Sequence, residues 1–288
     1  MKKFDGNLFA KHQLEKIKED VKVLVGNDVH PKVVSIVFTD DPASLLYTKF
    51  KQQSAEIVGI KFKAIKLKMS DSYATIKKAI IDSNLDESVT GVMIQKPSKM
   101  VWQSNTKLND FNDWWQRLVV LIDPSKDVDG LHPSTLEAIK RGGKKKDRKL
   151  LPATAQAVLD ILDESAFVKS MRVVVIGRSN IVGKPVYFVL KNQGVEIDLL
   201  GKQGLKEHLR KSAQLTDYDV VISATGVEGL ITGEMVKKGV ILIDVGEPKP
   251  DIDLDSVKEK AGFITPVPGG VGPVTVACLM KNAVRMVQ

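Results

Sequence analysis

A buried-strand pattern that ends in a glycine turn and leads into a helix constrains the fold more than any other part of this sequence. The run is Arg172-Val-Val-Val-Ile-Gly177-Arg178-Ser179-Asn180-Ile181-Val182-Gly183-Lys184-Pro185. A strand, a glycine turn and a helix N-terminus together can receive the phosphates of a dinucleotide. The spacing departs from G-x-G-x-x-G, because Ser179 and Val182 stand at the second and third glycine positions. Taken alone, the turn is also compatible with an ordinary connection between a strand and a helix.

Strand-like and helix-like segments alternate on both sides of this turn. Before it, apolar runs at 33–39, 60–67 and 91–94 predict strands, with helical spacing between them. After the basic segment at 140–149, the pattern predicts a second series. Its strands are 172–176, 195–200, 219–223 and 240–244, and its helices are 152–162, 184–192, 205–211 and 233–237. Such alternation produces parallel sheets that are covered by helices.

The pattern therefore predicts an α/β protein of two domains. The first is an N-terminal βαβ domain, and the second is a Rossmann-type, doubly wound dinucleotide domain. A last helix over 273–288 returns to the first domain. We place the domain boundaries at 1–150 plus 267–288 for the first domain and at 151–266 for the second.

A stretch rich in proline and glycine precedes the last helix. It reads Ile264-Thr265-Pro266-Val267-Pro268-Gly269-Gly270-Val271-Gly272-Pro273. Proline fixes φ, and glycine adopts backbone shapes that other residues cannot. The stretch predicts a stiff loop whose glycines let a flat ligand lie against bare backbone. Composition alone leaves open a mere tight connection before a helix.

Charge and composition exclude several classes of protein. The net charge of +8 requires that nucleic-acid binding be considered, but the main basic cluster at 140–149 contains no aromatic residue for stacking. We expect no nucleic-acid partner. No apolar run approaches the about 20 residues of a membrane span, so we expect no membrane association. The single cysteine, Cys278, excludes an internal disulfide and fits a cytoplasmic protein. The histidines are scattered, and we expect no metal site.

Two further motifs, taken together with the glycine turn and the proline-rich loop, are specific. Residues 42–51 fit P-A-S-x-x-Y-x-x-x-K, and residues 126–130 fit K-D-V-D-G. With these four motifs in this order, the chain resembles the bifunctional methylenetetrahydrofolate dehydrogenase/cyclohydrolases. The resemblance implies a homodimer that oxidises 5,10-methylenetetrahydrofolate with NADP⁺ and hydrolyses the methenyl product to 10-formyltetrahydrofolate. Tetrahydrofolate one-carbon derivatives are its expected ligands, and the first domain is its folate-binding catalytic domain.

The resemblance also implies roles for individual residues. Lys51 is the catalytic residue of the cyclohydrolase step, and Gln95, at a strand end, can hydrogen-bond this lysine and hold it in place. Burial would lower the pKa of Lys51, so that it exchanges a proton with water near neutral pH. Tyr47 packs on the folate, and Asp129 binds the pterin, although a turn-forming role for Asp129 is open. The proline-rich loop adds the substrate-binding residues Pro268, Gly269 and Gly270.

The residues near the glycine turn favour NADP as cofactor. Arg178 is placed to reach an adenosine 2′-phosphate, and Lys202 adds a second positive charge. No acidic residue ends the strand at 195–200 to bind a ribose hydroxyl in the manner of NAD enzymes. The predicted cofactor-binding residues are Gly177, Arg178, Ser179, Gly183, Lys202, Thr225 and Gly226.

The chain departs from the family pattern beside the predicted active site. Gln95-Lys96-Pro97-Ser98-Lys99 stands where the family has Q-L-P-L-P, and the tryptophan-rich segment at 98–123 is longer than usual. We expect its aromatic residues to pack rather than to bind a ligand. Residues 95–99 are expected to form a wall of the folate pocket. Their altered sequence leaves two alternatives open: a monofunctional methylenetetrahydrofolate dehydrogenase, or a non-catalytic basic protein that binds nucleic acid with the same fold.

Overall fold

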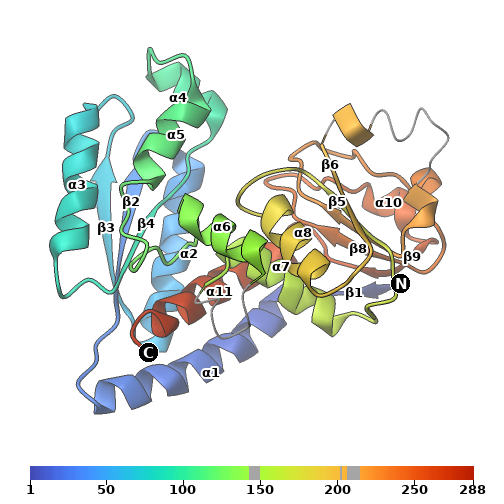
Figure 1. Cartoon of the computed structure of the whole chain (residues 1–288), viewed down its shortest axis with the longest axis horizontal. Helices are drawn as coiled ribbons and strands as arrows, with labels where there is room; N and C mark the ends of the chain where they lie inside the picture. Colours follow the sequence, from blue (N-terminus) through green and yellow to red (C-terminus); the bar gives the residue numbers. More distant parts are fainter. Residues whose placement is uncertain (143–149, 202, 206–214) are drawn as a thin grey trace. The chain divides into compact units, whose positions relative to one another are not determined.

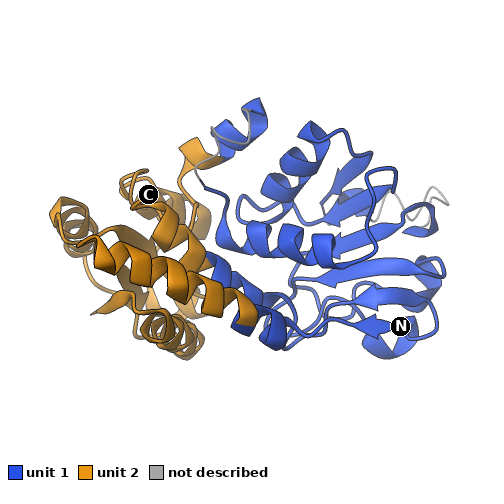
Figure 2. Ribbon diagram, turned by 90° about the horizontal axis from the view of Figure 1, so that it is seen from below, with its two compact units in different colours: residues 1–11, 136–278 blue, residues 12–135, 279–288 orange. Residues whose placement is uncertain are grey.

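The computed structural model describes residues 1–142, 150–201, 203–205 and 215–288 of the chain (Figure 1). Its contacts divide it into two compact units, which Figure 2 distinguishes by colour. Unit 1 consists of residues 1–11 and 136–278, and unit 2 consists of residues 12–135 and 279–288. Each unit is built on a parallel β-sheet, so the predicted α/β class with two sheets is confirmed.

Unit 2 contains the predicted βαβαβ series. Strand β2 (Lys32–Phe38) lies between β3 (Lys61–Leu67) and β4 (Gly91–Ile94) and is parallel to both. Helices α2 (Pro42–Val58) and α3 (Tyr73–Leu85) connect the strands. Every residue of β2 after the first is buried. This burial explains why the strand is apolar apart from Lys32 and Ser35, because a central strand of a covered parallel sheet is enclosed on both faces.

Helix α2 begins and ends at the signals that its sequence carries. The carboxylate of Asp41 caps its N-terminus by accepting the N–H of Ala43 at 3.2 Å, and Pro42 stands in the first turn. Gly59 ends the helix with φ of +83°, a conformation that favours glycine. The helix therefore starts directly after β2, at the carboxyl edge of the sheet.

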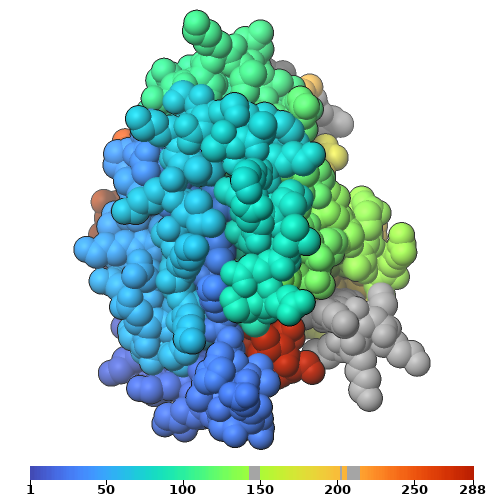
Figure 3. Space-filling view, turned by 90° about the vertical axis from the view of Figure 1, so that its left-hand side faces the viewer, coloured from blue at the N-terminus to red at the C-terminus, as the bar shows by residue number. Residues whose placement is uncertain are grey.

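The tryptophan-rich segment folds into two short helices, α4 (Lys99–Asn105) and α5 (Phe111–Val119). Its three indole side chains are at most 7% exposed and belong to the core of unit 2. The ring of Trp114 lies 5.4 Å from that of Phe38, measured between centroids. Figure 3 shows this segment (green) above α3 (cyan) on one face of the unit. The expected packing role of these aromatic residues is confirmed.

Unit 1 is built on a six-stranded parallel sheet of order β1-β9-β8-β7-β5-β6. Four strands match the predicted series, whereas β1 and β9 were not expected. The strands are β1 (Lys2–Lys3), β5 (Val173–Ile176), β6 (Ile197–Leu200), β7 (Val220–Ser223), β8 (Val240–Asp244) and β9 (Ala261–Ile264). The strand order reverses at β5, which pairs with β6 on one side and with β7 on the other. Open parallel sheets bind ligands beyond the carboxyl ends of their strands at such a point.

The helices of unit 1 include α7 (Ala153–Glu164) and α8 (Gly183–Asn192), close to their predicted bounds. The predicted helix at 233–237 is wrong. Gly233–Met235 forms one 3₁₀ turn, η2, which ends because Val236 is extended. A second 3₁₀ turn, η1 (Leu215–Asp217), and the short helix α10 (Leu254–Val257) complete the unit. The predicted helix at 205–211 lies mostly outside the described residues.

Three helices pass from one unit into the other: α1 (Gly6–Gly26), α6 (Pro133–Arg141) and α11 (Val271–Arg285). The units therefore divide inside helices, and residues 1–11 lie in unit 1 because β1 pairs with β9. The boundaries at 1–150 plus 267–288 and at 151–266 stay a prediction. The return of the last helix is confirmed, because residues 279–288 belong to unit 2 and the Asn282 amide donates to the Val128 carbonyl at 3.0 Å.

Candidate active site

Lys51 and Gln95 form the centre of the site in unit 2. Lys51 lies on the buried side of α2 with 8% of its surface exposed, and its Nζ donates to Oε1 of Gln95 at 2.8 Å. Gln95 directly follows β4, and its N–H pairs with the Ile36 carbonyl of β2. Burial lowers the pKa of the Lys51 amine, and the negative charge of Asp129 opposes this effect. A lysine in this setting can carry a proton closer to neutral pH than an exposed lysine can.

The loop that contains Asp129 is shaped by its neighbour Asp127. The buried Asp127 carboxylate accepts the N–H of Gly130 at 3.1 Å and that of His132 at 2.7 Å, and burial raises its pKa to about 6. Asp129 is partly exposed and accepts no hydrogen bond from the part of the chain that the structure describes. The turn-forming role therefore belongs to Asp127. The Asp129 carboxylate remains free to bind the N–H groups of a ligand.

These residues meet because their segments end at one edge of the same sheet. The backbone N–H of Val92 donates to the Lys126 carbonyl, and Val92 pairs in parallel with Asp127, so the loop continues the sheet beyond β4. Lys51 follows β2, Gln95 follows β4 and Asp129 follows this added segment. Tyr47 lies half-buried one helical turn before Lys51. The carboxyl edge of a parallel sheet thus brings together the four residues predicted for the N-terminal half of the chain.

The altered wall beside Gln95 is held by the tryptophan-rich segment. The ammonium of Lys96 lies 5.5 Å from the ring centre of Phe111 and 5.7 Å from that of Trp115. Aromatic faces attract cations at this distance. Lys96, which stands where the family pattern has an apolar residue, therefore packs its ammonium against two aromatic rings of α5.

Unit 1 contains the predicted cofactor turn. Gly177 follows β5 with φ of +122°, and a side chain there would collide with the Ala224 carbonyl. Gly183 begins α8 so close to the Gly177 carbonyl that a Cβ would overlap it. The Ser179 hydroxyl accepts the N–H of Val182 at 3.1 Å. Both glycines are thus required by close approach of backbone to backbone.

This turn fits the phosphates of a dinucleotide. Within the described residues, the backbone N–H groups of Arg178, Ser179 and Gly183 have no hydrogen-bond acceptor, and α8 has no side-chain cap. Unpaired N–H groups at a helix N-terminus bind anions. A Cβ on Gly201, after β6, would lie 3.1 Å from Cδ of Arg178. The arginine therefore lies across the end of β6, where dinucleotide domains bind the adenosine ribose and its 2′ substituent.

Thr225 and Gly226 form a turn after β7 that a buried aspartate holds in place. Asp251 accepts the N–H and the hydroxyl of Thr225, at 2.7 and 2.8 Å, and the N–H of Val227 at 3.0 Å. Gly226 has φ of +66°. The Thr225 hydroxyl is thus already bound to Asp251. A ligand at this turn would therefore contact its backbone. Asp251 was not predicted from the sequence.

The proline-rich loop in unit 1 is supported by the start of α1. The N–H of Gly6 donates to the Gly269 carbonyl at 2.9 Å, and a Cβ on Gly6 would collide with the Gly270 carbonyl. The peptide bond before Pro268 is cis, and Gly269 has φ of +95°. The special shape of the loop is confirmed, whereas its stiffness and its contact with substrate stay predictions. Lys202 and most of the basic cluster, residues 143–149, lie outside the described residues.

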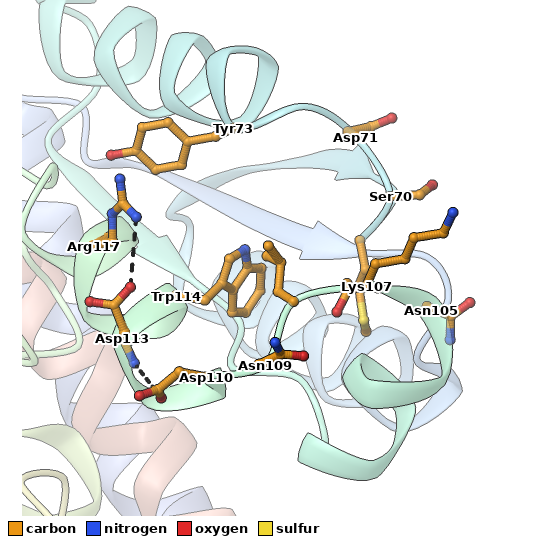
Figure 4. Close-up of a pocket in the computed structure, with 13 residues that line it drawn as sticks. Ser70, Asp71, Tyr73, Asn105, Lys107, Asn109, Asp110, Asp113, Trp114 and Arg117 are labelled. Carbon is orange, nitrogen blue, oxygen red and sulfur yellow. Dashed lines mark hydrogen bonds and ion pairs between the residues drawn. The ribbon is translucent and has the colours of Figure 1, made fainter.

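A cavity of about 700 Å³ lies elsewhere in unit 2, between the loop before α3 and the segment that joins α4 to α5 (Figure 4). Its arginine, Arg117, lies over the ring of Tyr73 at 5.2 Å and pairs with Asp113 at 3.6 Å. No predicted site residue lines it. The cavity is therefore separate from the Lys51 site.

No group of three or more histidine, cysteine, aspartate or glutamate side chains in the described residues could hold a metal ion. No helix among them is both long and apolar enough to cross a bilayer.

Comparison with known proteins decides the family. Residues 4–129 match the catalytic domain of tetrahydrofolate dehydrogenase/cyclohydrolase, and residues 152–288 match its NAD(P)-binding domain. The chain belongs to the tetrahydrofolate dehydrogenase/cyclohydrolase family. The resemblance drawn from the four motifs is thereby confirmed over nearly the whole chain.

Relatives in this family are similar over nearly their full length. The bifunctional protein FolD of Lactobacillus acidophilus is 38% identical over 291 residues, which cover 98% of this chain and 95% of the relative. The crystal structure of the bifunctional enzyme FolD from Campylobacter jejuni has a TM-score of 0.86 and 31% identity, and the match covers 100% of this chain and 98% of that one.

Solved members of the tetrahydrofolate dehydrogenase/cyclohydrolase family differ in their nicotinamide cofactor. The Trypanosoma brucei enzyme, solved with NADP and an inhibitor, has a TM-score of 0.87 and 27% identity, with 99% of this chain and 96% of that one covered. The NAD-dependent methylenetetrahydrofolate dehydrogenase of Saccharomyces cerevisiae has a TM-score of 0.81 and 25% identity, with 99% and 96% covered. Family membership therefore establishes NAD(P) binding and leaves the choice between the two cofactors to this chain's own residues.

Proposed function

We propose that the protein oxidises 5,10-methylenetetrahydrofolate with NADP⁺ and hydrolyses the methenyl product to 10-formyltetrahydrofolate. The observation that carries the proposal is the 2.8 Å contact between Lys51 and Gln95 at a buried sheet edge that Asp129 also faces. In the part of the chain that the structure describes, no acidic residue is in hydrogen-bond contact with this buried lysine. Burying a cation in this way is costly, which favours a functional role over a structural one.

Hydrolysis needs a group that moves a proton, and Lys51 supplies it. Water adds to the methenyl carbon and gives one proton to Lys51. The bond from this carbon to N5 of the folate then breaks, the remaining hydroxyl becomes the formyl carbonyl, and its proton passes to N5. Gln95 holds the amine in place through its Oε1. Asp129 orients the pterin by accepting its N–H groups.

Oxidation needs mainly alignment of the substrate carbon with the nicotinamide. NADP⁺ accepts the hydride when bound. The N–H groups of the turn at Gly177–Gly183 would hold its phosphates, and the Thr225–Gly226 turn, supported by Asp251, would lie on the nicotinamide side. Pro268, Gly269 and Gly270 would present backbone to the folate.

The preference for NADP over NAD rests on Arg178. Its side chain lies across Gly201 at the end of β6, and the strand itself ends in Leu199-Leu200 with no carboxylate to bind a free 2′-hydroxyl. A guanidinium in this position favours a 2′-phosphate. Lys202 adds positive charge to the same segment of the sequence. The proposal also includes a homodimer in the cytoplasm, in keeping with the family resemblance and the single cysteine.

A spectrophotometric assay with methylenetetrahydrofolate and each nicotinamide cofactor tests the proposal. Reduction of NADP⁺ in preference to NAD⁺, followed by loss of methenyltetrahydrofolate absorbance faster than in buffer, is the expected result. Reduction without accelerated loss of the methenyl compound would identify a monofunctional dehydrogenase. No reduction of either cofactor, together with salt-dependent binding of an oligonucleotide, would favour the non-catalytic alternative.

A further inference from the structure

Asp41 connects the two segments that carry Lys51 and Gln95. Its side chain is 2% exposed and lies between the end of β2 and the segment after β4. Oδ1 accepts the N–H of Ala43 at 3.2 Å and so caps α2. Oδ2 accepts the Ser44 hydroxyl at 2.9 Å and the N–H of Ser98 at 2.8 Å. One carboxylate thus joins residues that are 57 positions apart in the sequence.

The cap of α2 does not by itself explain this arrangement. A helix N-terminus needs one side-chain oxygen, and serine or asparagine would provide it. A buried carboxylate is costly unless each oxygen has donors, and here the additional donor comes from the Gln95–Ser98 segment. The Ser44 hydroxyl also lies 3.4 Å from the Lys96 carbonyl, which adds a second, weaker link between the same segments.

We propose that Asp41 is a positioning residue for the cyclohydrolase step: by binding Ser98 it fixes the Gln95 segment against α2 and thereby sets the contact between Gln95 and Lys51. The inference rests on the proposed function of Lys51. Asp41 does not touch the reacting atoms. Its effect reaches them because Gln95 lies three residues before Ser98, while Lys51 lies on the helix that Asp41 caps.

Ser98 offers a way to break this link without touching the cap. Its φ is −60°, which proline adopts, and its hydroxyl makes no capping bond to α4. Ser98→Pro therefore removes the N–H that binds Asp41 together with the hydroxyl. Ser98→Ala is the matched control, because it removes the hydroxyl and keeps this N–H. In Asp41→Asn the single amide oxygen caps α2 at Ala43, as asparagine does at helix N-termini, so the NH₂ faces the Ser98 N–H and the link is broken from the other side. Asp110→Asn serves as its control, because Asp110 also caps a helix, α5, by accepting backbone N–H groups.

The measurements are the kcat of each activity, the pH profile of the cyclohydrolase and the melting temperature. Ser98→Pro and Asp41→Asn should lower the cyclohydrolase kcat by roughly 10- to 100-fold, as expected when a catalytic group is misplaced by about 1 Å. The dehydrogenase kcat should change less than about threefold. The cyclohydrolase kcat of the double variant should be no lower than that of the less active single variant, because both substitutions remove the same bond between Ser98 and Asp41.

The pH profile distinguishes positioning from simple destabilisation. Asp129 is the charged group in the described chain whose field acts on Lys51, and neither substitution alters it. Loosening the Gln95 segment admits water and raises the pKa of Lys51 toward its ordinary value. Because a base must be unprotonated, the acidic limb of the profile should move to higher pH. A variant that was only less stable would keep the wild-type profile.

The outcomes separate this inference from the function on which it rests. An active wild type with an equally active Ser98→Pro variant overturns the positioning role alone. The same conclusion follows if both activities fall by the same factor with an unchanged pH profile. A wild type that does not accelerate hydrolysis of methenyltetrahydrofolate overturns the proposed function, and the inference with it.

Discussion

Replacing Lys51 with methionine should separate the two reactions. Methionine has nearly the length of the lysine side chain and no amine, so it fills the same buried site beside Gln95. Removing a group that transfers a proton lowers a rate by about 10²- to 10⁴-fold. At 1.36 kcal/mol for each factor of ten, the barrier to hydrolysis should rise by about 2.7 to 5.4 kcal/mol. Hydride transfer requires no side-chain acid or base, so the dehydrogenase should lose less.

The fold should tolerate this substitution. The Lys51 amine is desolvated and makes one hydrogen bond, to the partly exposed Gln95, which can turn to water instead. Replacing a buried charge with an apolar group of similar size is often neutral or stabilising. Lys49→Met provides the matched control, because Lys49 is exposed on the same helix.

The assay follows methenyltetrahydrofolate absorbance during turnover with NADP⁺. In the Lys51→Met variant this compound should accumulate as a released product, whereas wild type and Lys49→Met should convert it further. Equal rates of methenyl hydrolysis in wild type and Lys51→Met would refute the assignment of Lys51 as the proton carrier. Equal loss of both activities would mean that Lys51 supports the site as a whole.

Three further substitutions test the remaining parts of the site. Asp129→Ala should impair both activities and leave the Kd for NADP⁺ unchanged, because only the folate loses its anchor; full turnover would exclude this role. Arg178→Ala should weaken binding of NADP⁺ by about 1.5 to 3 kcal/mol, the usual cost of a charged hydrogen bond, and barely affect NAD⁺; equal weakening would make Arg178 structural. Asp127 has a folded pKa of about 6, above that of an unfolded aspartate, so the folded state binds more protons between pH 4 and 6. The free energy of unfolding of unit 2, followed by the fluorescence of its three tryptophans, should therefore fall as the pH rises through this range, and Asp127→Asn should flatten the slope; a slope of the opposite sign would show that burial does not control this group.

The sequence was sufficient for the elements that obey simple periodicities. Strand β5 is a continuous apolar run, and β2 is apolar apart from Lys32 and Ser35, because both faces of each strand are covered. This pattern is visible without any tertiary information. Strand β1 has two exposed lysines, so no apolar pattern could indicate it, and its pairing with β9 depends on the rest of the sheet. The prediction of a helix at 233–237 failed for a similar reason. Gly233 packs closely against the Ser256 carbonyl, a tertiary contact that local periodicity does not reveal.

The predicted residues that the structure brings together are those marked by local motifs. Lys51 and Tyr47 share one face of a helix, and Gln95 ends a strand, so their placement follows from secondary structure alone. Asp41 and Asp251 were missed because each binds donors that are distant in sequence. A signal was nevertheless present for Asp41, since an aspartate before a proline that opens a helix is a strong N-cap. The bond from Asp41 to Ser98 could not be predicted from the sequence, because it depends on where the Gln95 segment lies in the fold.

Lys96 and the tryptophan-rich segment pack against each other. A lysine in place of an apolar residue beside the site would need a counter-charge or an aromatic face to stabilise its cation. No carboxylate in the described residues forms an ion pair with Lys96, and the rings of Phe111 and Trp115 lie within 5.7 Å of its ammonium. Both rings come from α5, inside the segment that is longer than the family pattern. The segment thus supplies the surface on which Lys96 rests, while Gln95, one residue earlier, keeps its contact with Lys51. The contact between Lys51 and Gln95 is therefore compatible with a changed sequence in residues 96–99.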